Sequence, residues 1–143
     1  MANIALISCV SQKCGHRASA RNMYTSVLFK KTLKYTETIL RPDKIYVLSA
    51  KYYLWPLDGE EKDDYNETLI GKNKQDKDDW AEKVLRQLNE ENEITNDRFY
   101  ILAGKNYYEN LLSALKNYEI PMEGLTIGKR YQWLNTQLSK GNN

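Results

Sequence analysis

Short apolar runs along the chain predict the strands of a buried sheet. Residues 3–8, 44–49 and 98–103 are rich in aliphatic and aromatic side chains, and a shorter run covers residues 120–122. Short runs of this kind with no sustained polar alternation are typical of strands covered on both faces. We therefore expect three central strands and a short fourth one.

Segments with helical periodicity lie between these runs. Apolar residues recur three or four positions apart, which gives each segment one apolar face. The faces consist of Phe29, Leu33, Thr36 and Leu40 in a helix from about Ala20 that Pro42 ends; Trp80, Val84 and Leu88 in a helix with an acidic start at 76–79; Tyr108, Leu111, Leu112 and Leu115 in a helix after Gly104; and Tyr131, Leu134 and Leu138 in the last helix. This alternation predicts one α/β domain over residues 1–143, a three-layer sandwich with a short, mostly parallel sheet flanked by helices.

A long segment from Ala50 to about Lys74 has no sustained period and is rich in Asp, Lys and Gly. Loops of this length in a small domain are usually functional or mobile. We therefore expect a loop that is functional or mobile.

The composition is that of an ordinary globular protein. The chain has 143 residues, 41% of them hydrophobic and 28% charged, and a net charge of +2. That charge is too small to indicate nucleic-acid binding by itself. No stretch approaches the roughly 18 apolar residues of a membrane span, and no signal peptide is evident. We expect a cytoplasmic protein with no membrane partner.

The cysteine and tyrosine content bears on whether the protein has a metal site and what kind of surface it has. Cys9 and Cys14 are expected to be reduced thiols, because a zinc site would need more ligands than these and the single His16 supply. We expect neither a metal nor a cofactor. Eleven tyrosines against two phenylalanines suit a wet cleft or an interface, although tyrosine can equally replace phenylalanine in the core.

Polar residues and glycines follow the ends of the predicted strands. Because ligands of open α/β sheets bind beyond the carboxyl ends of the strands, these segments predict a binding site. Gly104 and Gly128 each precede a predicted helix, where backbone N–H groups favour an anion such as phosphate. The candidate ligand-binding residues are Ser8, Cys9, Lys13, Ser49, Ala50, Tyr52, Tyr53, Gly104, Tyr107 and Gly128.

Candidate catalytic groups lie in the long loop and at its start. A carboxylate such as Asp64, beside Tyr65, would act as a general base or stabilise a cationic sugar. The Lys51 ammonium group would bind a phosphate or stabilise the charged form of a nearby carboxylate. The alternatives are a solvated acidic loop and a solvated lysine. We take Asp64, Tyr65 and Lys51 as the catalytic candidates.

Several segments together resemble a family of small bacterial and phage domains of unknown function. That family in turn resembles the archaeosine-synthase-like and peroxide-stress YaaA-like group, which is distantly similar to uracil-DNA glycosylases. The segments, which occur in the same order and span nearly the whole chain, are ARNMYTSVLF (20–29), LSAKYYLWPLD (48–58), YNETL (65–69), LAGKNYYENLL (102–112) and MEGLTIGKRYQWL (122–134).

The resemblance implies a site for a nucleoside or nucleotide. Ser49, Lys51 and Tyr52 would form its floor, and Tyr53 and Trp55 would offer faces for base stacking. The family pattern reads S-A-K-Y-G, so Tyr53 stands where the family has glycine. We expect the Tyr53 ring to stack on the ligand or to close part of the pocket.

These observations lead to alternative functions. The first is an enzyme of the N-glycosylase or ribosyl-transfer type that acts on an N-glycosidic bond. The second is a non-catalytic module that sequesters a nucleotide, for instance in phage anti-defence. A third is a structural or inhibitory protein that acts through its tyrosines. The expected partner is a nucleotide or nucleoside, with nucleic acid and a second copy of the chain as further candidates.

Overall fold

The computed structural model describes residues 1–8 and 13–141. Cys9, one of the candidate ligand-binding residues, lies outside them. No helix in the described ranges combines the length and the apolar character needed to cross a bilayer.

The centre of the molecule is a five-stranded sheet in the order β3-β2-β1-β4-β5. Its strands are β1 (Asn3–Ile7), β2 (Lys44–Ser49), β3 (Tyr53–Pro56), β4 (Arg98–Leu102) and β5 (Asn117–Glu119). β1 pairs in parallel with β2 and β4, β4 pairs in parallel with β5, and β3 is antiparallel to β2. The predicted fold class, an α/β sandwich with a mostly parallel sheet, is confirmed.

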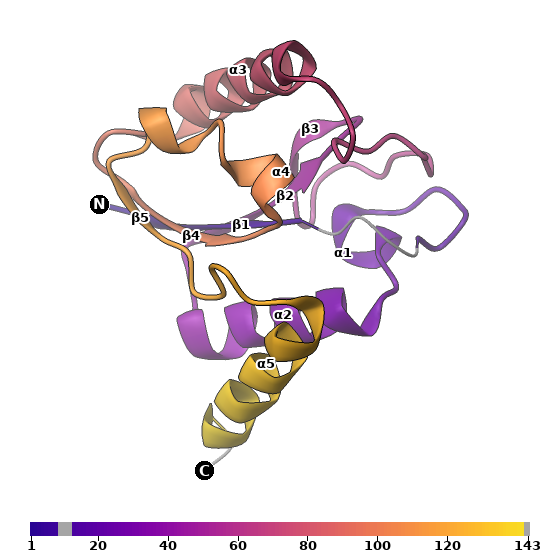
Figure 1. The fold of residues 1–143 in the computed structure, drawn as a ribbon, viewed down its shortest axis with the longest axis vertical. Coiled ribbons are helices and arrows are strands. Elements are labelled where there is room, and N and C mark those ends of the chain that lie inside the picture. Colours follow the sequence, from indigo (N-terminus) through magenta and orange to yellow (C-terminus); the bar gives the residue numbers. More distant parts are fainter. Residues whose placement is uncertain (9–12, 142–143) are drawn as a thin grey trace.

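Helices cover both faces of the sheet (Figure 1). The long α3 (Lys74–Glu91) and the short α4 (Lys105–Tyr108) lie on one face, and α2 (Val27–Tyr35) and α5 (Ile127–Gly141) lie on the other. Three shorter pieces complete the set: α1 (Ala20–Met23), the π-helical η1 (Thr36–Leu40) and the 3₁₀-helical η2 (Leu112–Ala114).

Alternation along β1 divides the core into two halves. Ile4 and Leu6 belong to the cluster under α3, whereas Ala5 and Ile7 belong to the cluster under α2 and α5. All four side chains are fully buried. A strand with no exposed face reads as a continuous apolar run, which is why this strand could be predicted from sequence.

Local signals that the apolar pattern does not carry alter four of the predicted elements. The helix expected from about Ala20 to Leu40 is interrupted, because Ser26 caps a new helix by accepting a hydrogen bond from the Phe29 N–H at 3.1 Å. The expected loop at 50–74 contains β3. The helix expected after Gly104 is only the four-residue α4, followed by η2, and the last strand ends at Glu119 rather than covering residues 120–122.

Candidate functional site

A cavity of about 420 Å³ opens where β1 and β4 end. The chain leaves β1 for β2 on one side and returns to β4 on the other, so the cavity lies at the topological switch point of the sheet. The start of α2 and the β5–α5 connection complete its wall. The position and volume are typical of a site for a small organic ligand.

The inner wall of the cavity is apolar. Phe29 and Leu102 are buried in the core below it, and Met122 and Ile120 follow β5. These side chains offer a dry surface to a planar or aliphatic group. They contribute shape and hydrophobic contact but no chemistry.

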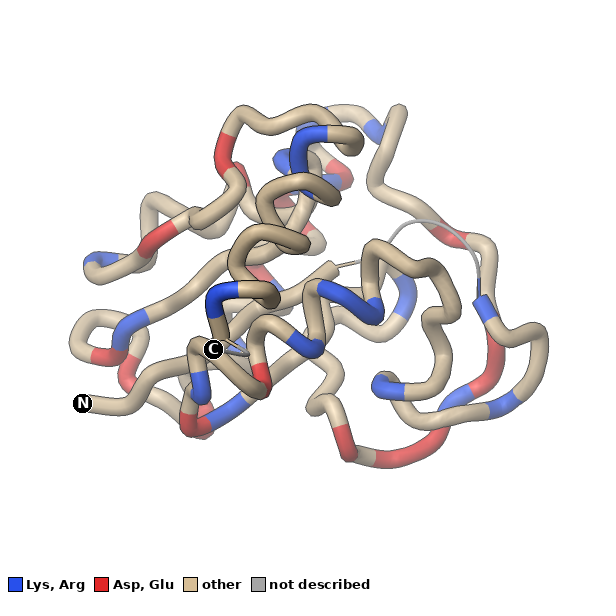
Figure 2. The backbone as a smooth tube through the Cα atoms, turned by 90° about the horizontal axis from the view of Figure 1, so that it is seen from below, with Lys and Arg blue, Asp and Glu red and all other residues tan. Residues whose placement is uncertain are grey.

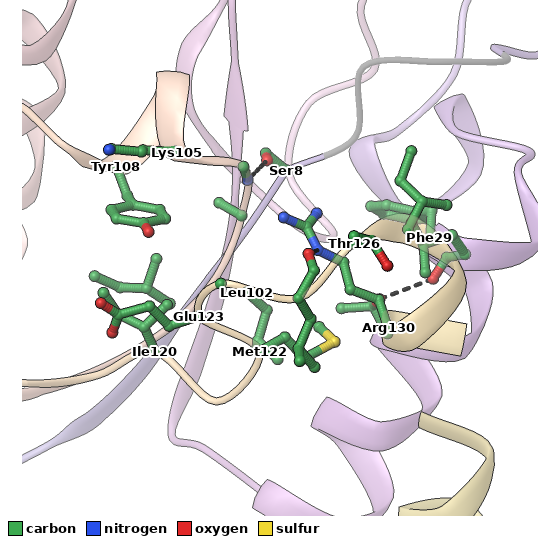
Figure 3. Close-up of a pocket in the computed structure, with 18 of the residues that line it drawn as sticks. Ser8, Phe29, Leu102, Lys105, Tyr108, Ile120, Met122, Glu123, Thr126 and Arg130 are labelled. Atoms are coloured by element: carbon green, nitrogen blue, oxygen red, sulfur yellow. Dashed lines mark hydrogen bonds between the residues drawn. The ribbon is translucent and has the colours of Figure 1, made fainter. Parts of the chain in front are cut away.

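A cation enters the same cavity from α5. Figure 3 shows the Arg130 side chain reaching into the cavity, with its guanidinium on the side of Ser8. Its Nε donates to the carbonyl oxygen of Leu125 at 3.1 Å, which fixes the orientation of the side chain. No carboxylate among the described residues forms an ion pair with Arg130. A fixed guanidinium without a protein counter-ion is suited to bind an anionic ligand.

The start of α5 adds to the positive potential of this wall. Gly124 makes the turn into the helix with a φ of 77°, and the hydroxyl of Thr126 accepts a hydrogen bond from the Lys129 N–H at 3.3 Å. The N-terminal end of a helix of this length carries a partial positive charge. Lys105, at the start of α4, is an exposed cation on the opposite rim.

A phenol and a carboxylate lie on the other side of the cavity. Tyr108 is 8% exposed, and its hydroxyl points toward Ile120 and Glu123 (Figure 3). Burial raises the Tyr108 pKa above its usual value, and the negative charge of Glu123 raises it further, whereas Arg130 lowers it. Tyr108 is therefore a neutral hydrogen-bond donor at physiological pH, beside an exposed carboxylate.

The ends of the two central strands are joined at the cavity wall. The N–H of Gly104 donates to Oγ of Ser8 at 3.1 Å, and the N–H of Ser8 donates to the carbonyl oxygen of Leu102 at 3.3 Å. Ser8 and Gly104, both expected to bind ligand, thus line the cavity. The helix that begins after Gly104, α4, has only four residues, so its dipole adds little to the attraction for an anion that was expected there.

A second group of the predicted residues gathers outside this cavity, around two phenol rings. The rings of Tyr52 and Tyr65 meet edge to face at 5.4 Å. Lys13 lies 4.6 Å from the Tyr65 ring centre, and Lys51 lies 5.5 Å from that of Tyr52. We call these four residues the Tyr52–Tyr65 cluster. Its members were expected at the ligand, but none of them lines the cavity.

Two of the groups expected to act in catalysis, Asp64 and Tyr65, make hydrogen bonds within the protein. Asp64 accepts a hydrogen bond from the N–H of Tyr65 at 2.8 Å, within its own loop. The Tyr65 hydroxyl forms a 2.5 Å hydrogen bond with that of Tyr24 in the buried interior. None of the three catalytic candidates, Asp64, Tyr65 and Lys51, lines the cavity.

Other predicted ligand contacts serve the turn after β2. Oγ of Ser49 accepts hydrogen bonds from the N–H groups of Lys51 and Tyr52 at 3.3 and 2.9 Å, and Ala50 packs against both halves of the core. Trp55 is fully buried and donates to the carbonyl oxygen of Glu60, so it offers no face for stacking.

The backbone conformation of Tyr53 explains why the family pattern has glycine at this position. Its φ is 62°, in the left-handed region that favours glycine. Its ring lies under α3, where Lys83 Nζ is 4.9 Å from the ring centre and 3.2 Å from the hydroxyl. The glycine of the family pattern therefore matches the geometry of the turn, and the ring packs on α3 rather than into the cavity.

Tyr107 and Gly128 also lie outside the cavity wall. Tyr107 is buried edge to face against Trp80 at 5.7 Å, and its hydroxyl accepts from the Leu69 N–H at 3.5 Å. Gly128 is exposed in the first turn of α5. Cys14 lies elsewhere, and its Sγ donates a hydrogen bond to the carbonyl oxygen of His16. The described residues contain no group of three or more His, Cys, Asp or Glu side chains that could hold a metal ion.

Comparison with known proteins gives one family. Residues 4–136 match the family described as "Family of unknown function (DUF6884)". The chain belongs to this family. No curated protein and no solved structure gives a significant match. The match runs from β1 into α5, so the segments that enclose the cavity all lie within the DUF6884 domain.

Sequence reasoning missed the side chains that give this DUF6884 domain its charged cavity. Tyr108 reads as part of an apolar helical face, Lys105 was passed over in favour of its neighbour Gly104, and Glu123 and Arg130 belong to no predicted strand or apolar helical face. One usable signal was present. The turn between Gly124 and Gly128 is flanked by Glu123 and, one helical turn into α5, by Arg130.

Proposed function

We propose that the cavity binds a nucleotide or a phosphorylated nucleoside. The observation that carries the proposal is the Arg130 guanidinium, fixed over an apolar wall by its bond to Leu125 and in no ion pair with a carboxylate of the described residues. A ligand that satisfies both features has an anionic group and an apolar face. Residues 122–134, which include Arg130, are among the segments that resemble a family of small domains, and the further resemblance of that family to nucleobase-handling proteins favours the same ligand class.

The apolar wall and the cationic wall would contact different parts of the ligand. The base would lie against Phe29 and Met122, where it loses contact with water at little cost in hydrogen bonds. The phosphate would accept hydrogen bonds from Arg130 and from the first N–H groups of α5, with Lys105 on the opposite rim. The apolar wall selects for a planar group, and the cations select for the charge.

Cleavage of the N-glycosidic bond is the reaction that Glu123 and Tyr108 favour. The Glu123 carboxylate would stabilise positive charge on the sugar as the bond between sugar and base breaks. Tyr108, whose raised pKa keeps it protonated, would donate a hydrogen bond to the departing base. Water then adds to the sugar, and its proton leaves with the base. Sequestration without reaction is the alternative, in which both residues only position the ligand.

Mass spectrometry after incubation with nucleosides and nucleoside monophosphates tests both the binding of the ligand and the cleavage of its N-glycosidic bond. We expect wild-type protein to retain a nucleotide or to release its free base. Arg130→Gln should weaken binding by about 10- to 100-fold, as expected for loss of a charged hydrogen bond, whereas Arg86→Gln on α3 should not change it. Glu123→Gln should abolish base release but retain the nucleotide. No binding of any nucleoside or nucleotide contradicts the proposal, and intact ligand throughout favours sequestration.

A further inference from the structure

The two helical layers carry different charge. α2 contains Lys30, Lys31 and Lys34, α5 contains Lys129, Arg130 and Lys140, and neither helix contains an acidic residue. In α3, by contrast, six acidic side chains outnumber four basic ones. The net charge of +2 for the whole chain therefore conceals one strongly basic layer.

The cations of the basic layer form no ion pair with the described residues of the protein. No ion pair in the described part of the chain involves any of these six side chains. On α3, Lys74 and Arg86 pair with carboxylates four residues away. Lys30 and Lys34 are like charges at the same spacing, which destabilises a helix unless an anion lies nearby. This arrangement fits an external anionic partner.

The two basic helices form one surface. Lys31 is hydrogen-bonded to the side chain of Asn135, and Tyr35 packs edge to face on Trp133 at 4.9 Å. Figure 2, seen from this side, shows basic segments on both neighbouring helices. Glu37, in the η1 segment that follows α2, is paired with Arg21 at 2.8 Å. We call the outer surface of α2 and α5 the basic face.

The basic face runs up to the cavity. Ser26 and Leu28 at the start of α2 line the cavity, as do Ile127 and Arg130 at the start of α5. Ile127 is 64% exposed, and Val27, between Ser26 and Leu28, is 55% exposed. Two apolar side chains therefore stand in water where the basic face meets the cavity, in a position to contact bases next to one held inside.

We propose that the basic face binds the phosphate backbone of a single-stranded nucleic acid, one nucleotide of which enters the cavity. The inference rests on the proposed function of the cavity and specifies a polymeric substrate. Repeated phosphates match cations spread along two helices, and unpaired bases offer apolar surface to Val27 and Ile127. An anionic membrane fits less well, because the basic helices expose only these two large apolar side chains, both at one end.

Fluorescence anisotropy with labelled 15-nucleotide single strands of DNA and RNA tests this inference. The variant Lys30→Gln/Lys34→Gln/Lys129→Gln removes three cations that do not line the cavity. We expect at least tenfold weaker binding, and a salt dependence whose logarithmic slope falls by about 2, or roughly 0.7 for each lost contact. The matched control Lys74→Gln/Lys83→Gln/Arg86→Gln removes the same charge from α3 and should bind like wild type.

Nucleoside monophosphates and vesicles with 30% phosphatidylserine complete the experiment. We expect the variant of the basic face to bind a monophosphate as wild type does, because Arg130 is retained. Monophosphate binding without oligonucleotide binding would overturn the polymeric substrate and leave the proposed function standing. The proposal of a polymeric substrate would also be overturned if the α3 control weakened oligonucleotide binding equally, or if the protein bound vesicles but not oligonucleotides. Binding of neither monophosphates nor oligonucleotides would overturn both proposals.

Discussion

Oγ of Ser8 accepts a hydrogen bond from the backbone N–H of Gly104 at 3.1 Å, although the two residues are 96 positions apart. This bond joins the ends of β1 and β4 just beyond their last parallel pair, Ile7 and Leu102. It satisfies the N–H that begins the turn into α4, and it leaves the Ser8 hydroxyl hydrogen to donate to a ligand. The bond thus connects the core of the sheet to the cavity wall.

Ser8→Ala should therefore reduce both stability and ligand affinity. Loss of one hydrogen bond predicts a decrease of about 0.5–1.5 kcal/mol in the free energy of unfolding, measured by urea denaturation. Affinity for a nucleoside monophosphate should fall in calorimetry. Ser113→Ala, at an exposed serine of η2, is the matched control and should alter neither quantity. Unchanged affinity in Ser8→Ala would show that Ser8 has only a structural role.

Tyr53 provides a test of backbone strain. Tyr53→Gly and Tyr53→Ala both remove the ring that packs under α3, but only alanine keeps a Cβ at a φ of 62°. The left-handed conformation costs a non-glycine residue roughly 1–2 kcal/mol, and the entropy of glycine offsets part of this. We expect the glycine variant to be more stable than the alanine variant by about 1 kcal/mol. An alanine variant of equal or greater stability would contradict this account.

Trp80 should be a main determinant of stability. It is 5% exposed, its Nε1 donates to the carbonyl oxygen of Ser49 at 2.8 Å, and its ring packs on Tyr107. Trp80→Ala should lower the free energy of unfolding by about 3–5 kcal/mol, as expected for a large aromatic side chain of the core. Trp80→Phe should lose less, because the ring is largely kept. An alanine variant with wild-type melting temperature would mean that α3 contributes little to the core.

Asp97 should make stability depend on pH. Its buried carboxylate accepts hydrogen bonds from the N–H groups of Ala2 at 2.9 Å and Glu93 at 2.8 Å, and these hold its pKa below the usual value of 3.8. Because the folded pKa is lower than the unfolded one, the stabilisation is complete above the unfolded pKa. It is lost as the pH falls through the folded pKa.

Asp97→Asn removes this titration. At pH 7 we expect a loss of about 1–3 kcal/mol, because an amide nitrogen cannot accept the second hydrogen bond. Between pH 5 and pH 2, wild type should lose more stability than the variant, so the two should converge. Parallel stability curves for the two proteins over that range would show that Asp97 is not the group responsible.

The parts of the fold that could be predicted are those in which burial alone determines the pattern. β1, with Ile4 to Ile7 fully buried, and α3, with Trp80, Val84 and Leu88 on one buried face, follow from apolar spacing. β3 could not be predicted, because it has four residues, ends in Pro56 and depends on pairing with β2. The interruption before α2 depends on one Ser26 hydroxyl.

The candidate site was predictable in its place but only partly in its residues. The rule that ligands bind beyond parallel strands correctly selects Ser8 and Gly104 as neighbours. It also selects Ser49, whose hydroxyl is occupied by the turn that follows. Arg130 was not predicted, because it lies on a helix rather than at the end of a strand. Its place in the cavity depends on how α5 packs on α2. That packing is a tertiary property with no local mark.

The location of the bound ligand shows whether the cavity or the Tyr52–Tyr65 cluster is the binding site. Isotope-labelled protein should be titrated with a nucleoside monophosphate and followed by NMR. We expect shifts of the Gly104 and Ile127 amides and of the Arg130 Nε–H, all at the cavity, with no change at Lys51 or Tyr52. Shifts confined to Lys51, Tyr52 and Tyr65 would contradict binding in the cavity.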